Sequence, residues 1–138
     1  MGVSIEMTKA YMESKGMRYR QTDDGKALIC GIGGLDNAPD IDILVVFDDN
    51  DTGVMLRTYN ICKFSEDKLQ KMYKACSEQN AHFRWIRFYV NKEKDAVMCQ
   101  DDAIIQPDTA GQEIFELMMR MAGIIDEAYP NFMKAMWA

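Results

Sequence analysis

Hydrophobic and polar residues alternate along several segments of the chain, and this alternation predicts β-strands. The clearest segment is Ile41–Phe47, in which Ile, Ile, Val and Phe occupy every second position. The run Arg84–Val90 alternates in the same way and is followed by a charged turn. The other predicted strands are shorter or less regular, and they cover Met17–Thr22, Lys26–Ile32, Val54–Ile61 and a segment that begins at Ala96.

Other segments repeat their apolar residues at the spacing of an α-helix. The pattern predicts a first helix over Ser4–Lys15 and a second that begins after Ser65 and stops near Asn80. It predicts a last helix over Ala110–Tyr129, which Pro130 ends. The resulting order, α-β-β-β-β-α-β-β-α, predicts an α+β fold in which an antiparallel sheet carries its helices mainly on one face.

The last predicted helix is apolar over about 180° of its circumference, more than the roughly 100° that one core contact needs. Two interpretations stay open at this point. Another helix of the same chain covers the excess surface, or a second subunit or a partner protein does. Methionines are frequent here, and flexible thioethers suit both cores and adaptable binding surfaces. We therefore count Met118 and Met121 as candidate interface residues.

A second candidate interface comes from the alternating run near position 85. Trp85, Arg87 and Tyr89 share one strand face, opposite the face that we expect to pack on the helices. Arg57, on a neighbouring strand, could lie beside them. Aromatic residues mixed with arginine are typical of protein-binding surfaces. The alternative is a tryptophan that a helix or loop covers, with arginine stems packed along it.

Length and charge narrow the range of functions. The 138 residues are the usual size of one domain, so we expect a single domain over residues 1–138. The net charge of −6 argues against binding to nucleic acids or to anionic membranes. The chain has no apolar run long enough for a membrane span and does not start like a signal peptide. We therefore expect a cytoplasmic protein with reduced cysteines.

Motifs that could carry chemistry fit structural roles better. Asp48–Gly53 resembles the start of a calcium loop, but Tyr59 stands where the twelfth position needs a glutamate. Gly31–Gly34 lacks the rest of a phosphate-binding motif. His82 is the only histidine, and no Cys-x-x-Cys spacing occurs among the cysteines, which are Cys30, Cys62, Cys76 and Cys99. We predict no catalytic residue, no metal and no cofactor.

The order of these elements, with the residues that fill them, resembles the YbjN family of bacterial sensory transduction regulators. The resemblance is densest over residues 69–132, through the Leu69–Cys76 helix, the strand end Phe88–Val90 and the helix end Ala128–Phe132. The short strand Met17–Tyr19 also fits. The resemblance implies an α+β fold shared with type III secretion chaperones, and a homodimer. It brings no catalytic residue with it.

We therefore expect a non-catalytic binding or regulatory module, chaperone- or adaptor-like, that forms a homodimer and contacts a protein or peptide. The alternative is a small-ligand sensor with a pocket between the sheet and the last helix. A cysteine- or carboxylate-based enzyme is the third hypothesis. A deep apolar pocket would favour the sensor, and a flat aromatic surface would favour the partner-binding module. A cysteine close to His82 would favour the enzyme.

Overall fold

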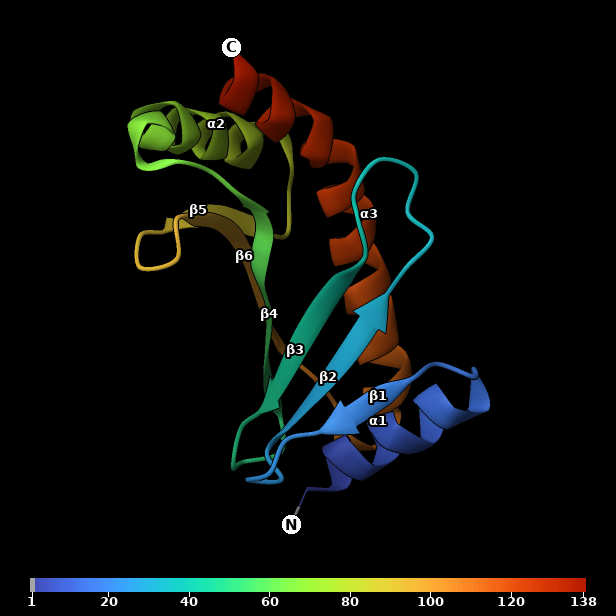
Figure 1. Cartoon of the computed structure of the whole chain (residues 1–138). Helices are drawn as coiled ribbons and strands as arrows, with labels where there is room; N and C mark the ends of the chain where they lie inside the picture. The colour runs from blue at the N-terminus through green and yellow to red at the C-terminus, as the bar shows by residue number, and fades with distance from the viewer. Residues whose placement is uncertain (1) are drawn as a thin grey trace.

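The computed structural model describes residues 2–138 as a six-stranded antiparallel sheet with three α-helices (Figure 1). The α+β fold class and the predicted order of elements are confirmed. Short 3₁₀ helices, Glu66–Lys68 and Pro107–Thr109, lead into the second and third helices. The helices are α1 (Val3–Ser14), α2 (Leu69–His82) and α3 (Ala110–Trp137). The strands are β1 (Tyr19–Gln21), β2 (Ala27–Ile32), β3 (Ile41–Phe47), β4 (Gly53–Lys63), β5 (Arg87–Asn91) and β6 (Ala96–Ile104).

The strands lie in the order β1-β2-β3-β4-β6-β5. Strand β4 is the longest, and its register with β6 shifts between Thr58 and Cys62, which bends the sheet there. Strand β5 is shorter than β6 and pairs with residues 96–100 of it only. The last four residues of β6, Asp101–Ile104, therefore pair with β4 on one side and with no strand of residues 2–138 on the other.

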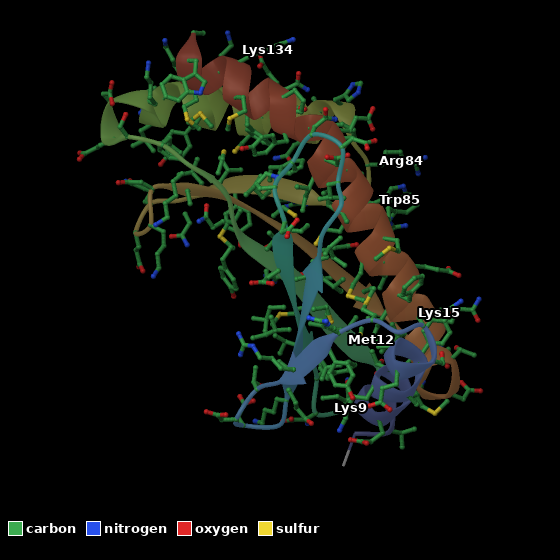
Figure 2. The ribbon with its side chains drawn as sticks, turned by 45° about the vertical axis from the view of Figure 1, so that its right-hand side comes forward. Lys9, Met12, Lys15, Arg84, Trp85 and Lys134 are labelled. Carbon is green, nitrogen blue, oxygen red and sulfur yellow. The ribbon has the colours of Figure 1, made fainter. Side chains whose placement is uncertain are left out.

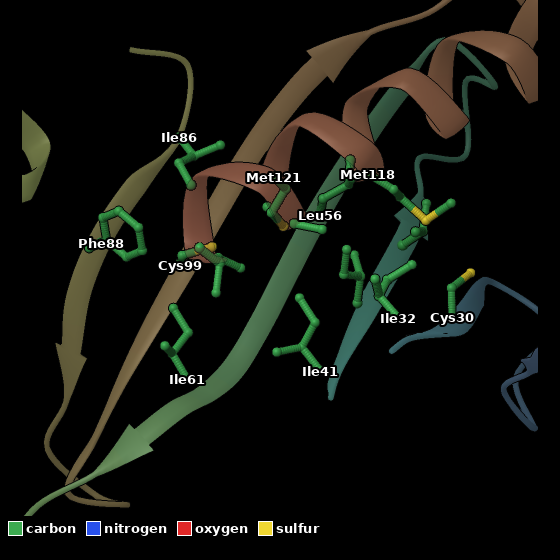
Figure 3. Close-up of a cluster of buried hydrophobic side chains, with 14 of the residues drawn as sticks. Cys30, Ile32, Ile41, Leu56, Ile61, Ile86, Phe88, Cys99, Met118 and Met121 are labelled. Carbon is green, nitrogen blue, oxygen red and sulfur yellow. The ribbon is translucent and has the colours of Figure 1, made fainter. Parts of the chain in front are cut away.

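The core lies between one face of the sheet and the helices. The predicted alternation of β3 is confirmed, because Ile41, Ile43, Val45 and Phe47 are all buried. Figure 3 shows side chains of the sheet and of α3 meeting in this layer. The largest fully buried side chains are Phe88, Phe132, Met12, Leu28, Ile43, Leu56, Met72, Ile105, Ile114, Met118, Met121 and Ile125. No helix within residues 2–138 is long and apolar enough to cross a membrane.

The Asp48–Gly53 turn holds the start of α1. The backbone N–H groups of Val3 and Ser4 donate to the carboxylate of Asp51 at 3.1 and 2.9 Å, and the Ser4 hydroxyl donates to the Asp51 carbonyl at 2.6 Å. A carboxylate at a helix N-terminus satisfies donors that have no partner inside the helix. Asp51 also adopts a φ of 68°, a left-handed conformation that Asp tolerates in turns. This turn therefore serves as a distant cap for α1.

The prediction that the last helix ends at Tyr129 is wrong, since α3 continues through Pro130 to Trp137. A proline inside a helix leaves the carbonyl four residues earlier without its N–H donor. Here that carbonyl belongs to Asp126, and the Asn37 side-chain amide donates to it at 3.4 Å. The Asp126 carboxylate also accepts the backbone N–H groups of residues 36–38 at 3.2, 2.7 and 2.8 Å. The loop before β3 thus covers the proline site and bonds the carbonyl that Pro130 leaves without its backbone donor.

The predicted stop at Asn80 is also wrong, because α2 runs on to His82. Asn80 instead links the helix to the sheet. Its side-chain carbonyl accepts the Phe88 N–H at 2.7 Å, and its amide donates to the Phe88 carbonyl at 2.8 Å. This two-way contact fixes β5 against α2 and places the start of β5.

Candidate functional site

The face of the sheet opposite the helices is bare. In Figure 1, α3 passes behind β2 and β3, and the near side of the sheet carries no helix. Alternation along β4 buries Val54, Leu56 and Thr58 and leaves Met55, Arg57 and Tyr59 on the other side. We call this side the bare face. The strand register places further residues on the bare face around Met55, Arg57 and Tyr59. They include Ile29, Leu44, Val46, Arg87, Gln100 and Asp102.

Arg57 organises the middle of the bare face. Its Nη1 donates to Asp102 Oδ1 at 2.8 Å, and its Nη2 lies 3.5 Å from the Met55 sulfur. Its side chain is largely covered by these neighbours. Tyr59 beside it is 50% exposed, and burial raises the pKa of the Tyr89 hydroxyl. The result is an aromatic and thioether surface around the Arg57–Asp102 ion pair. A shallow hollow of about 390 Å³ lies beside Arg57 and Tyr59, and Arg20, Asp40 and Asp42 also line it.

The prediction that Trp85 belongs to this face is wrong. Strand β5 begins only at Arg87, so Trp85 lies outside the strand. Its φ of 82° turns the chain away from the strand direction. The Trp85 ring, 59% exposed, contacts the guanidinium groups of Arg84 at 4.7 Å and Arg120 at 4.4 Å. Figure 2 shows Arg84 and Trp85 beside α3. The structure therefore brings Arg57, Arg87 and Tyr89 together on the bare face and places Trp85 elsewhere.

Met118 and Met121 are 0% exposed and lie in the core, so no partner of the folded chain can reach them. Their expected role at an interface does not hold for the folded chain. The broad apolar arc of α3 is covered within the chain, because the sheet packs on one part of it while α1 and α2 pack on others. The first of the two interpretations of this helix is therefore correct.

Sequence reasoning missed one charged pair that the fold brings together. Asp101 is only 7% exposed, and its Oδ2 lies 3.3 Å from Arg120 Nη2. Burial raises the pKa of this carboxyl, although Arg120 acts against the shift. The available signal was the strand pattern, since Asp101 continues the buried positions Val97 and Cys99. Among residues 2–138 Asp101 is the only buried acid.

The cysteines are poorly suited to nucleophilic chemistry. All four are free and buried. Burial raises the pKa of Cys30 and Cys76 to about 12 and that of Cys62 to about 11, and it raises the pKa of Cys99 as well. A thiol with such a pKa is protonated at neutral pH, whereas the nucleophile is the thiolate. His82 ends α2 and packs edge-on against Phe83 at 4.6 Å between ring centroids. No group of three His, Cys, Asp or Glu within residues 2–138 is arranged to hold a metal ion.

Solved structures share this fold at low sequence identity. One is YbjN from E. coli, titled a putative transcription regulator, with 12% identity, a TM-score of 0.58 and 90% of each chain covered. Another is a chain of the HopA1–SchA chaperone–effector complex, with 13% identity and a TM-score of 0.51. That match covers 90% of this chain and 94% of the other. At these identities the similarity establishes a type III secretion chaperone-like fold.

The sequence gives a separate and more direct assignment. No curated protein sequence matches the chain. A family model does match, over residues 4–132, and its description is "YbjN: Putative bacterial sensory transduction regulator". The match spans every helix and strand from α1 into the last turns of α3. The chain therefore belongs to the YbjN family.

Proposed function

We propose that this protein is a non-catalytic binding module, chaperone- or adaptor-like, that holds a protein or peptide partner on its bare face. The observation that carries this proposal is the exposure of Met55 and Tyr59 beside the neutralised Arg57 on a helix-free sheet. Tyrosine, methionine and arginine are enriched at protein interfaces, and charged side chains at their centres are rare. A surface with these features is well suited to a protein and offers little to a small polar substrate.

The fold neighbours support the same function. The HopA1–SchA structure is a chaperone–effector complex, so a fold of this kind does occur in assemblies with another protein. We infer a cytoplasmic location as well, because four free cysteines suit a reducing compartment. A small-ligand sensor is less well supported, since the space between the sheet and α3 is filled by fully buried side chains such as Leu56, Met118 and Met121.

We further propose that a second copy covers the bare face when no partner is bound. Soluble proteins seldom leave a contiguous apolar surface uncovered. A two-fold contact of the bare face with itself is the simplest closed arrangement. The partner then displaces the second copy, and both contacts depend on Tyr59.

Chemical crosslinking in the native cell, followed by affinity capture and mass spectrometry, tests the proposed function. We expect Tyr59→Glu to lose specific proteins that the wild-type chain captures, because a charge in the bare face opposes apolar contact. The matched control is Tyr73→Glu, an exposed tyrosine of α2 away from this face, which should retain them. Identical captures by the two variants, or no captured protein that differs from a mock sample, would contradict the proposal.

A further inference from the structure

The unpaired part of β6 borders the bare face, to which Asp102 contributes its side chain, and its backbone groups pair with no strand of residues 2–138 on the outer side. We call residues Asp101–Ile104 the open edge. Ile105 N–H donates to the Thr52 carbonyl on the β4 side at 2.8 Å. Antiparallel ladders alternate, so the residue before it turns its backbone groups the other way. By the same alternation Asp102 and Ile104 direct their N–H and C=O groups away from β4, into the open edge. The Ile104 side chain is 84% exposed.

The chain leaves this edge unpaired because of the turn at Trp85. If β5 continued backwards in its own register, residues 83–86 would pair with the open edge. Instead the φ of 82° at Trp85 takes the chain out of that line, and Ile86 N–H bonds back to the Arg84 carbonyl at 3.0 Å. A bulky residue with positive φ is unusual and persists only when its surroundings enforce it. The Trp85 ring contacts the guanidinium groups of Arg84 and Arg120.

The space that β5 leaves is hollow along its whole length. One hollow of about 740 Å³ is lined by Trp85, Arg87 and residues 100–102 of β6. A second, of about 200 Å³, follows along residues 103–105 and is walled by Leu117 of α3. Together they form a concave strip beside one strand edge, which is the shape that an extended peptide fills in strand addition.

Asp101 and Asp102 of the first hollow and Arg120 of the second are held in ion pairs, Asp102 with Arg57 and Asp101 with Arg120. The charges that remain outside these pairs have opposite sign at the two ends of the strip. Arg84 and Arg87 lie at the end near Trp85, and neither has an ion-pair partner among residues 2–138. Glu113 and Glu116 of α3 wall the other end, and neither has a cation within ion-pair distance in the described chain. A peptide antiparallel to β6, like β5, starts near Ile104 and finishes near Trp85. Charge complementarity then calls for basic residues at its N-terminal end and acidic residues at its C-terminal end.

We propose that the open edge receives an extended segment of the protein partner as an added strand, antiparallel to β6, basic at its start and acidic at its finish. This inference rests on the proposed function and adds the position where the partner's backbone docks. Asp102 and Ile104 supply the backbone hydrogen bonds. The exposed ring of Trp85 packs against the C-terminal, acidic end of the segment.

A second copy of this chain is a poorer occupant than a peptide. A two-fold contact joins a surface to the same surface, so it would set one concave strip against another and leave both unfilled. The strip is also short, with one strand edge of four residues, Asp101–Ile104. Edge pairing of that length buries less than the roughly 1,200 Å² of a stable interface. An extended segment fills the strip instead of facing another hollow, and the rest of its protein adds contacts on the bare face.

NMR titration of the full chain tests the inference without any variant. The probe is a synthetic peptide of alternating valine and threonine, with two lysines at its start, two glutamates at its finish and neutral capped ends. At about 1 mM peptide, a level suited to weak contacts, we expect the Asp102 and Ile104 amides to shift and to exchange more slowly with solvent. The matched probe has the same residues with lysines and glutamates exchanged, and it should bind several-fold more weakly.

Two variants then separate the backbone contact from the side chain. Ile104→Pro removes an N–H that points away from β4, so the chain should fold, and binding should weaken about tenfold. Ile104→Val keeps that N–H and should bind like wild type. Three results would overturn the inference: no shift with either peptide, amides already protected in the free dimer, or shifts confined to Arg57 and Tyr59. The last result leaves the proposed function standing, because it moves the contact to the bare face.

Discussion

Asp101 is a carboxyl group in a place that opposes its charge. Its side chain points to the helix side of β6, where Val97 and Cys99 before it are buried. Arg120 compensates part of this charge, with its Nη2 3.3 Å from Asp101 Oδ2, but its Nε has no hydrogen-bond partner among residues 2–138. Desolvation of the Asp101 carboxylate outweighs the contact with Arg120, so the pKa of Asp101 rises above its ordinary value. A buried charge with one imperfect partner is weak support for a fold.

This raised pKa predicts the sign of a stability change. The folded chain binds a proton at Asp101 more tightly than the unfolded chain, so the charged carboxylate costs stability at neutral pH. Asp101→Asn resembles the protonated acid. We expect it to melt at a higher temperature than wild type near pH 7, with the gap closing as the pH falls toward about 4, the ordinary carboxyl pKa.

The control is the neighbouring acid on the opposite face. Asp102→Asn removes an exposed ion pair with Arg57 and should be neutral or slightly destabilising at pH 7. Melting curves of the two variants and wild type over a pH series decide the matter. A lower melting temperature for Asp101→Asn at neutral pH would mean that the Arg120 pair, and not desolvation, controls this site.

Strand alternation placed Arg57, Arg87 and Tyr89 correctly on the bare face and placed Trp85 there wrongly. The alternation of β4 correctly puts Arg57 outside, because side-chain direction in a strand follows position. Trp85 could not be placed in this way. Its φ is 82°, and its ring contacts Arg120, which is 35 residues further along the chain and on α3. A pattern read along the sequence has no access to such a contact.

At the scale of elements, α1 crosses α3 where the chain has a glycine. A Cβ on Gly111 would lie 2.8 Å from the Met7 carbonyl oxygen and closer still to the Tyr11 Cβ. Gly123, further along α3, has no atom within 4 Å of the same position. Both are helix residues, so the two sites differ in packing and not in backbone class. This difference allows one substitution to be measured with and without the crossing.

We expect Gly111→Ala to destabilise the fold and Gly123→Ala to stabilise it. Alanine is favoured over glycine in a helix by about 1 kcal/mol, and this gain applies at both sites. At Gly111 the crossing helices must separate, which costs roughly 1–3 kcal/mol or more. Urea unfolding gives both free energies. Stabilisation by Gly111→Ala would show that α1 is loosely packed on α3.

The bounds of the elements were predictable only where the chain decides them locally. The predicted end of the first helix at Lys15 and the run of β3 follow from neighbouring residues, and both are close to the observed bounds. The partners of two element bounds are another matter, because Asn37 bonds the Asp126 carbonyl at the Pro130 site and Asp51 bonds the first N–H groups of α1. Each of these partners lies 47 or more residues away along the chain, so each could be found only from the folded structure.

At the scale of the whole molecule, apolar contact and net charge oppose each other. Each copy carries a net charge of −6, so two copies repel at low ionic strength. The bare face favours association, because it exposes Met55 and Tyr59 and its central Arg57 is neutralised by Asp102. Added salt screens the repulsion and leaves apolar burial intact. A dimer built on the bare face should therefore tighten as salt rises.

Sedimentation equilibrium at micromolar concentration tests this arrangement. We expect a species of twice 15.8 kDa whose dissociation constant falls as sodium chloride is raised from low to physiological levels. Tyr59→Glu should give the monomer at every salt concentration, because it sets two new charges against each other across the two-fold axis. Trp85→Glu should still dimerise, since Trp85 lies beside α3 and not on the bare face. A monomer of wild type throughout would refute the dimer, and loss of dimer in Trp85→Glu alone would move the interface to the edge of the sheet.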